Sequence, residues 1–215
     1  VLNHLRVRAG SEKIILSRAL NKILAEDVVA PQNVPRENNS AVDGYAIFFD
    51  DLNESGKTKL PVVGKAAAGR PLNFKQKRGE AVRIFTGAVM PHGVNSENPD
   101  TVLMQEDCEL EDGKVIIPAG IKRGSNRRLA GEDITSGACI LKEGQRLRPQ
   151  DIGLAAATGR AFLRVRRPLR VAVFSTGDEV LNPGDRFARG KIYDSNRFTL
   201  LNLLTALGCE VKDIG

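Results

Sequence analysis

The chain has 215 residues, which is longer than one average domain, so we expect two or three folding units. Hydrophobic residues make up 41% of it, yet no apolar run approaches the ~18 residues of a transmembrane helix, and the start shows no secretory signal pattern. The net charge is +6, with twelve Lys and Arg against four Asp and Glu between Gly120 and Arg170. Phe162 is the only aromatic residue in that stretch, which favours a solvated basic face or an oxyanion site over a nucleic-acid interface.

Two short apolar runs lie within residues 12–29 and predict strands joined by a turn at Asn21, because Asn tolerates a positive φ. A single amphipathic helix over residues 12–25 is the alternative, since the leucines there also fit a helical spacing. Pro31 and Pro35 then interrupt regular structure.

From Leu60 to Ala119 the sequence changes to short β-like runs separated by Gly and Pro, the pattern of a small β-rich domain. The loop-then-strand segment Asn39–Ala46 precedes these runs. The predicted strands are Leu60–Val63, Ala81–Phe85, Thr101–Met104 and Lys114–Ile117.

A short helix is predicted after Arg148, because Pro149 suits a first turn and Asp151 favours the positive end of the helix dipole. Gly159 is a natural stop for that helix, and a strand is predicted at Ala161–Val165.

The end of the sequence predicts a parallel β-α-β unit. Val171–Phe174 is a continuous apolar run, as expected of a strand buried on both faces. Asp194–Asn196 begins a leucine-rich helix that ends at Gly208, and Glu210–Ile214 begins a second strand. Two strands and one helix cannot bury an α/β core, so we expect this unit to be unfinished.

Two segments of this unit could carry chemistry. Ser175–Glu179 follows a buried strand, at the edge where open α/β sheets place ligands. Gly177 permits a tight turn there, while Asp178 and Glu179 offer hard oxygen ligands suited to Mg²⁺. The helix start at Asp194–Asn196 offers backbone N–H groups to an anion. An exposed acidic turn and an ordinary helix cap are the structural alternatives.

Three other segments carry polar side chains next to strands or turns. Asp43-Gly44 is by itself a turn signal, and Thr86 follows a predicted strand. Arg127 and Arg128 could bind an oxyanion through paired hydrogen bonds, although a surface ion pair with Glu132 or Asp133 is the alternative.

Common catalytic and metal-binding patterns are missing from the sequence. Cys108, Cys139 and Cys209 are widely separated, and His4 and His92 stand alone, so we expect buried, reduced thiols and no zinc site. No Ser-His-Asp or Cys-His set is present. The Gly pattern fits neither a P-loop nor a dinucleotide fingerprint, which argues against nucleotide hydrolysis and hydride transfer.

Five segments in this order resemble the molybdopterin molybdenumtransferase family, which includes MoeA and the gephyrin E domain. They are SAVDGYA at Ser40–Ala46, FTGAVMP at Phe85–Pro91, NRRLAGEDI at Asn126–Ile134, STGDE at Ser175–Glu179 and KIYDSN at Lys191–Asn196. Asp27-Val28 and Met104–Glu106 also match the family style. Each motif is weak alone, but their order and spacing cover nearly the whole chain.

The resemblance implies a multidomain fold of the α/β plus β-rich class. Residues 1–37 and 130–166 would form a discontinuous linking domain, and residues 38–129 an inserted β-rich domain. Residues 167–215 would be the truncated first β-α-β of a parallel α/β domain like that of the molybdopterin-binding MogA proteins.

The resemblance also implies a cytoplasmic, homodimeric transferase of molybdenum cofactor biosynthesis. It would insert its substrate molybdate into adenylated molybdopterin and release AMP, with Mg²⁺ as cofactor. The molybdopterin adenylyltransferase is a candidate partner, and neither nucleic acid nor a membrane is expected. A non-catalytic pterin-binding or dimeric scaffold module is the alternative function.

Functional residues carry over by position in the matching motifs. Asp43, Thr86, Arg128 and Glu179 are the expected catalytic residues, the first three of them shaping the site across a dimer interface. Asp178 and Glu179 would hold Mg²⁺. The expected substrate-binding residues are Ser175, Thr176, Gly177, Asp194, Ser195 and Asn196.

The sequence departs from the family pattern at several positions. Val42 stands where Met is common, Val89-Met90 and Ala130 differ from frequent choices, and Asn95–Pro99 looks like an insertion. The family's later glycine-rich loop, its Pro-Gly-Lys-Pro segment and its C-terminal β domain have no counterpart in these 215 residues. We therefore expect the molybdate-holding residues to lie beyond Gly215, and these 215 residues to be inactive alone.

Overall fold

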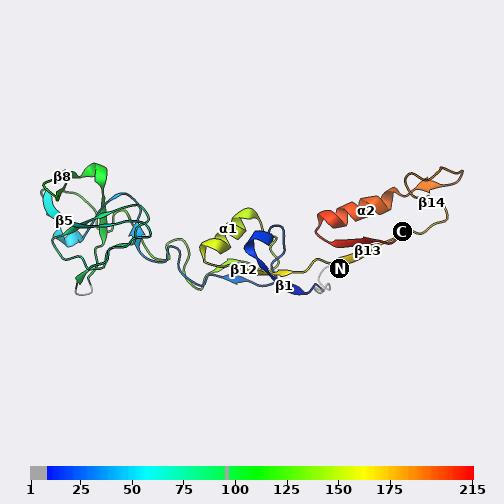
Figure 1. The fold of residues 1–215 in the computed structure, drawn as a ribbon, viewed down its shortest axis with the longest axis horizontal. Coiled ribbons are helices and arrows are strands. Elements are labelled where there is room, and N and C mark those ends of the chain that lie inside the picture. The colour runs from blue at the N-terminus through cyan, green and yellow to red at the C-terminus, as the bar shows by residue number, and fades with distance from the viewer. Residues whose placement is uncertain (1–8, 95–96) are drawn as a thin grey trace. The chain divides into compact units, whose positions relative to one another are not determined.

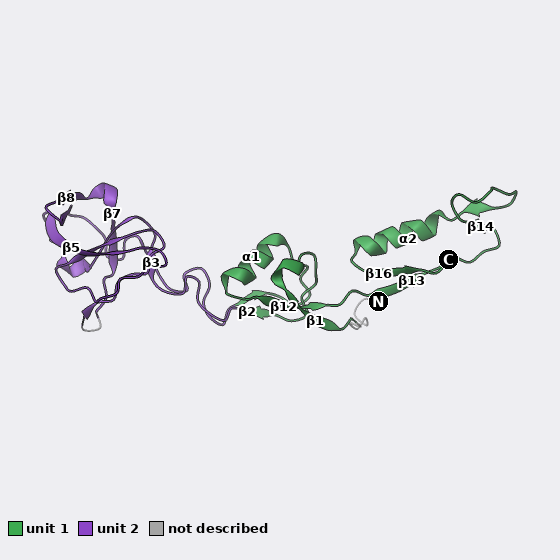
Figure 2. Cartoon of the chain, viewed as in Figure 1, with its two compact units in different colours: residues 1–29, 139–215 green, residues 30–138 purple. Residues whose placement is uncertain are grey.

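The computed structural model describes residues 9–94 and 97–215 (Figure 1). The described residues form two compact units, one from residues up to Val29 together with those from Cys139 onward, the other from Ala30–Ala138 (Figure 2). The three-domain boundaries implied by the family resemblance stay a prediction. His4 and part of the expected insertion at Asn95–Pro99 lie outside the described residues.

The unit Ala30–Ala138 is built on one six-stranded sheet with the order β7-β4-β6-β5-β9-β8. All neighbouring pairs are antiparallel except β5 with β6, so the sheet is mixed. Its strands are β4 (Gly44–Ile47), β5 (Thr58–Ala66), β6 (Ala81–Ile84), β7 (Thr101–Met104), β8 (Glu109–Glu111) and β9 (Lys114–Ile117). Two further strands, β3 (Asn39–Ser40) and β10 (Arg127–Arg128), pair with each other, and the 3₁₀ turns are η3 (Phe49–Asp51) and η5 (Gln105–Asp107).

Both faces of this sheet are covered, because successive residues of a strand point to opposite sides. Tyr45 and Ile47 of β4 belong to one core cluster, which also contains Leu103. Ala46, between them, belongs to a second cluster with Val82. Every residue of β4 is therefore buried.

Gly44 is required where β4 meets β7. A Cβ atom at this position would lie 1.6 Å from the carbonyl oxygen of Leu103, far inside contact distance. The Asp43-Gly44 pair read from the sequence as a turn signal is thus also a point of close backbone approach.

The other unit contains two short antiparallel pairs around its own core. They are β1 (Ser11–Ile15) with β12 (Phe162–Arg166), and β2 (Val28–Val29) with β11 (Cys139–Leu141). Asn21 has φ 62°, and a 3₁₀ turn, η2 (Leu16–Arg18), follows β1. The two-run interpretation of residues 12–29 is therefore confirmed and the single-helix alternative is wrong.

Helix α1 (Pro149–Ala157) begins and ends as the sequence predicts. Pro149 is its first residue, and Gly159 follows its end with φ 82°. The Asp151 carboxylate accepts hydrogen bonds from the Arg148 backbone N–H at 2.9 Å and from Arg148 Nε at 3.0 Å. These hydrogen bonds, chiefly those from the Arg148 side chain and next the one from its backbone N–H, lower the pKa of Asp151 to about 2.

The predicted parallel β-α-β unit is present, with β13 (Arg170–Val173), α2 (Ser195–Ala206) and β16 (Glu210–Asp213). A short parallel pair, β14 (Val180–Leu181) with β15 (Ile192–Tyr193), precedes α2. The prediction that Val171–Phe174 is buried on both faces is wrong. Val173 is buried but Phe174 is 62% exposed, because β16 is the only strand paired with β13 among the described residues.

The three cysteines are free thiols. Cys108 and Cys209 are half-buried, but Cys139 is exposed on β11, so the expectation that all three are buried is wrong for Cys139. Burial raises the pKa of Cys108 to about 11. No helix in residues 9–94 and 97–215 is long and apolar enough to cross a membrane.

The close approach at Gly44 leads to a stability prediction. Gly44→Ala should lower the free energy of unfolding of the unit Ala30–Ala138 by about 3 kcal/mol or more, because the added methyl meets backbone that cannot move aside cheaply. Gly56→Ala is the matched control, since a Cβ there has no neighbour within 4 Å among the described residues, and it should change this value by under ~0.5 kcal/mol.

Urea unfolding would be followed by tyrosine fluorescence in a Tyr193→Phe background. Tyr45 is then the only tyrosine in the chain, and it is buried in the unit under test. Equal midpoints for the two alanine variants would contradict the assigned role of Gly44.

Candidate functional site

The first group of predicted site residues meets at one end of the six-stranded sheet. Asp43 directly precedes β4 and Thr86 lies just after β6, and the antiparallel register pairs Gly44 with Ile84. The Thr86 backbone N–H and Thr86 Oγ1 both donate to Asp43 Oδ1, each at 2.8 Å. These two hydrogen bonds, of which the backbone one has the larger effect, hold the pKa of the Asp43 carboxyl below its usual range. Asp43 and Thr86 thus form one hydrogen-bonded pair, 43 positions apart in the sequence.

Arg83 of β6 lies beside this pair and was not singled out by the sequence. Its Nη1 donates to the Gly44 carbonyl at 2.8 Å, and its Nη2 donates to Gln105 Oε1. The guanidinium carbon lies 5.0 Å from the ring centroid of Tyr45 and 4.7 Å from that of Phe85. Two rings and two acceptors therefore hold the guanidinium in place.

Gln105, the first residue of η5, connects Asp43 to a second carboxylate. Its backbone N–H donates to the Asp43 carbonyl at 3.0 Å, and its Nε2 donates to Glu106 Oε1 at 2.9 Å. The bond from Gln105 lowers the pKa of Glu106 most, while the charge of Asp43 acts in the opposite direction. We call Asp43, Arg83, Thr86, Gln105 and Glu106 the Asp43 cluster.

Arg128 has a different environment from the Asp43 cluster. It forms ion pairs with Asp133 at 2.6 Å and Glu132 at 3.5 Å, the alternative that the sequence left open. Arg128 belongs to β10, which pairs with β3. The backbone of Ser40 in β3 forms hydrogen bonds with Gly87 and Ala88 in the turn after Thr86. Among the described residues, no hydrogen bond or ion pair joins Arg128 to Asp43 or Thr86 directly.

Six of the twelve basic residues in the stretch Gly120–Arg170 form ion pairs in the described part of the chain. Besides Arg128, they are Arg123 with Asp50 and Asp100, Lys142 with Asp27, Arg148 with Asp151, Arg164 with Glu26 and Arg166 with Glu143. The solvated, mixed-charge face is therefore the better description of this stretch.

The second group of predicted residues lies in the β-α-β unit. The turn Ser175–Glu179 follows β13, and Gly177 has φ 150°. A Cβ at Gly177 would lie 2.6 Å from Glu179 Oε2, so the Glu179 carboxylate folds back over this glycine. Lys191 Nζ donates to the carbonyl oxygen of Asp178. Thr176, Asp178 and Glu179 are exposed.

Asp194 is the N-cap of α2, with its Oδ1 accepting from the Arg197 backbone N–H at 3.0 Å. Hydrogen bonding from the Ser175 side chain, and then from the Arg197 N–H, lowers the pKa of Asp194. The Ser175 side chain, in the acidic turn, therefore lies near the carboxylate at the helix start. Asp194 is 7% exposed, whereas Ser195 and Asn196 are exposed at the first turn.

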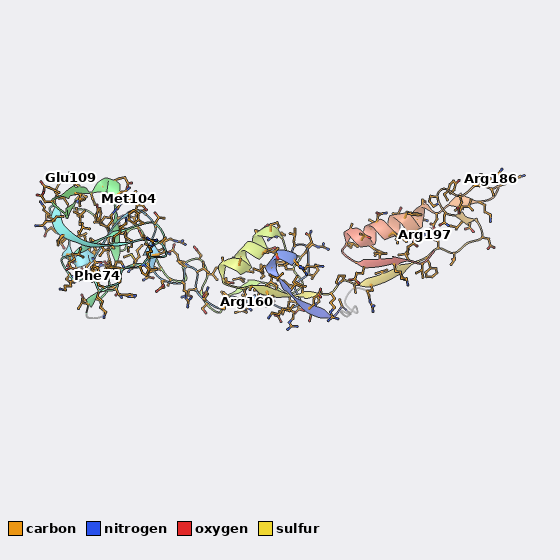
Figure 3. All side chains as sticks on the ribbon, viewed as in Figure 1. Phe74, Met104, Glu109, Arg160, Arg186 and Arg197 are labelled. Atoms are coloured by element: carbon orange, nitrogen blue, oxygen red, sulfur yellow. The ribbon has the colours of Figure 1, made fainter. Side chains whose placement is uncertain are left out.

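Arg197 is a second arginine that the sequence did not single out (Figure 3). It is also 7% exposed and forms ion pairs with Asp194 at 3.2 Å and Asp213 at 3.3 Å. Its Nη2 donates to Asn182 Oδ1. Arg197 therefore ties the start of α2 to the end of β16 and to the loop after β14.

The carboxylates of Asp178 and Glu179 fit a Mg²⁺ ion that takes its remaining ligands from a bound substrate or water. Both are exposed oxygen donors on adjacent residues, and Mg²⁺ commonly uses one or two carboxylates together with substrate phosphates. Across residues 9–94 and 97–215, no three His, Cys, Asp or Glu residues gather into a complete protein-only metal site.

The chain matches known proteins along its whole length. Residues 1–159 match the family model "MoeA N-terminal region (domain I and II)". The molybdopterin molybdenumtransferase of Haemophilus influenzae is 42% identical over 216 residues, covering 100% of this chain and 52% of the relative. That of a Nostoc species is 36% identical over 203 residues, covering 93% and 45%.

A solved structure agrees with these sequence matches. The molybdopterin biosynthesis MoeA protein of Pyrococcus horikoshii superimposes with a TM-score of 0.90 at 33% identity, covering 100% of this chain and 54% of that one. The chain therefore spans about half the length of the relatives it matches.

The Asp43–Thr86 pair leads to a pKa prediction. Thr86→Val keeps the backbone N–H but removes the hydroxyl, so the pKa of Asp43 should rise toward its ordinary value, while Thr86→Ser should leave it low. Carbon-detected NMR titration of the Asp43 carboxyl measures both variants.

The lowered pKa of Asp43 in the folded protein also makes the free energy of unfolding depend on pH. Ionised Asp43 stabilises the fold above its unfolded-state pKa, and this contribution is lost as the pH falls through the lower folded-state pKa. Identical Asp43 titration curves for Thr86→Val and Thr86→Ser would show that the hydroxyl bond has no effect on the carboxyl.

Proposed function

The chain belongs to the MoeA family of molybdopterin molybdenumtransferases, and we propose that it forms the N-terminal and middle part of such an enzyme of molybdenum cofactor biosynthesis. The reaction would insert molybdate, a substrate, into adenylated molybdopterin and release AMP. The observation that carries this proposal is the 42% identity to a named transferase across 100% of the chain. The hydrogen-bonded pairing of Asp43 with Thr86, from two of the matching motifs, adds support.

The β-α-β unit would bind the phosphate groups of the substrate. The hydroxyls of Ser175, Thr176 and Ser195 are suitable donors to phosphate oxygens, and Gly177 lets the backbone approach closely. The N-terminus of α2, opened by Asp194 and including Asn196, favours an anion through its backbone N–H groups.

Asp178 and Glu179 would hold Mg²⁺ at the same edge. When bound there, Mg²⁺ supplies positive charge against the phosphate oxygens as the bond to AMP breaks. Glu179 also belongs to the proposed catalytic set, because its carboxylate would keep that charge in place.

Asp43, Thr86 and Arg128 would shape the reaction site. Hydrogen bonds from Thr86 lower the pKa of Asp43 below its usual range, which suits an acceptor that orients a bound group better than a proton-transferring base. Arg128, paired with Asp133 and Glu132, would hold the turn after β10 in place. Such a site depends on placed charges more than on a strong base.

The finer architecture belongs to the same proposal. We infer a discontinuous linking domain of residues 1–37 and 130–166, an inserted β-rich domain of residues 38–129 and a MogA-like α/β domain beginning at residue 167. We further propose that the full-length protein is a cytoplasmic homodimer with the Asp43 region near the dimer interface. The molybdopterin adenylyltransferase is its candidate partner. Residues of the full-length protein outside this chain would hold molybdate.

The proposed reaction predicts molybdate-dependent release of AMP from adenylated molybdopterin by the full-length gene product. The 215-residue chain alone should bind the pterin without turnover. Binding without turnover by the full-length protein would favour a pterin-binding scaffold over a transferase, and absence of both would contradict the proposed function.

The acidic turn predicts a second result in the full-length protein. Glu179→Gln should lower Mg²⁺-dependent AMP release about 100-fold, because it removes an anionic ligand of the metal whose charge stabilises the developing anion. The control is Glu210→Gln, an exposed glutamate at the start of β16 in the same unit, which should keep wild-type rates. Unchanged release in Glu179→Gln would refute the metal role of the turn.

A further inference from the structure

Four contacts within the protein fix the orientation of the Arg83 side chain. Both of its terminal nitrogens are used inside the protein, one on the Gly44 carbonyl and one on Gln105 Oε1. Its guanidinium also lies against the rings of Tyr45 and Phe85. A side chain with these four contacts is oriented before any ligand arrives.

The partners of Arg83 are the groups that determine where Asp43 lies. Gly44 is the next residue in the chain, and Gln105 donates its backbone N–H to the Asp43 carbonyl at 3.0 Å. The two peptide carbonyls at and after Asp43 are thus both held, one by Gln105 and one by Arg83. Thr86 then orients the carboxylate itself.

Arg83 also brings a positive charge near Asp43 and Glu106. Hydrogen bonds from Thr86 lower the pKa of Asp43 most, and the bond from Gln105 lowers that of Glu106 most. The charge of Arg83 acts in the same direction on both, whereas the charge of Asp43 raises the pKa of Glu106. Two nearby carboxylates without a cation would resist ionising together. The other charged groups near the cluster are Lys65 of β5, whose Nζ lies 4.8 Å from the Phe85 ring centroid, and Asp107 of η5.

Lysine could not replace this set of contacts. A guanidinium presents planar, forked donors that reach two acceptors while stacking on aromatic faces, and an ammonium is a compact point charge. The cross-strand register places Arg83 opposite Tyr45 on β4 and opposite Lys65 on β5, so the arginine lies between these two residues across the sheet.

We propose that Arg83 is a positioning residue that joins the start of β4 to η5, and so holds Asp43 and Glu106 in place for the reaction. This inference rests on the proposed function for its consequence on turnover. Its geometric part, the joining of Gly44 to Gln105 by one guanidinium, can be tested without turnover.

The turnover test uses Arg83→Gln, Arg83→Lys and the control Arg70→Gln in the full-length protein. Arg70 is an exposed arginine in the same unit, before β6. We expect kcat for molybdate-dependent AMP release to fall about 100-fold in Arg83→Gln with KM for adenylated molybdopterin changed less than about threefold, because a displaced group affects the reacting geometry more than binding. Arg83→Lys should recover less than a tenth of the lost rate, and Arg70→Gln should match wild type.

The titration test uses the 215-residue chain and reads the carboxyl groups by NMR. In Arg83→Gln the pKa values of Asp43 and Glu106 should both rise, in Arg83→Lys they should stay close to wild type, and in Arg70→Gln they should not change. If Arg83→Gln fails to fold by circular dichroism, Gln105→Met removes the acceptor of Arg83 Nη2 and should lower kcat. The pKa of Glu106 is not used as the readout for this variant, because Gln105 itself donates to that carboxylate.

The outcomes separate the two proposals. An active wild-type protein with unchanged kcat in Arg83→Gln, or in Gln105→Met where that variant is used, overturns the positioning role. Unchanged pKa values for Asp43 and Glu106 in Arg83→Gln overturn it as well. A wild-type full-length protein that releases no AMP overturns the proposed function, while the titration still decides whether Arg83 organises the two carboxylates.

Discussion

The antiparallel pairing of β4 with β6 and β7 brings the polar residues of one sheet end together. The register that sets Gly44 opposite Ile84 places Asp43 next to Thr86, and it sets Tyr45 opposite Arg83. The same strand approaches β7 so closely that only glycine fits at position 44. Because η5 follows β7 directly, Gln105 and Glu106 arrive beside Asp43 through the same pairing. The site is thus a consequence of strand register, and a one-residue slip would separate its members.

Carboxylates serve different purposes in the two polar regions. Asp194 is almost fully buried and is used by the protein itself, capping α2 and pairing with Arg197. Asp178 and Glu179, a short distance along the chain, are exposed and open to a ligand. Asp43 stands between these cases, since it accepts two bonds from Thr86 yet remains partly exposed.

Much of the fold could be predicted from local sequence, and most of the site contacts could not. Thr101–Met104 and Lys114–Ile117 are strands with the predicted bounds, because short apolar runs between turn residues have few other stable conformations. The sequence does not single out Arg83 and Arg197, because an arginine inside a strand or in a first helical turn resembles an ordinary exposed charge. Their roles depend on partners such as Gln105 and Asp213, distant in sequence, and no local pattern encodes those contacts. The strands β14 and β15 have two residues each, too few for a period to be read.

The central claim is that Asp43 and Arg83 act as one unit in the proposed insertion of molybdate. A double-mutant cycle on kcat, with Asp43→Asn and Arg83→Gln made singly and together in the full-length protein, tests it most directly. If Arg83 works by holding Asp43, the double variant should be little slower than the slower single variant. Losses that multiply, with the double variant slower by the product of the two single effects, would contradict the account.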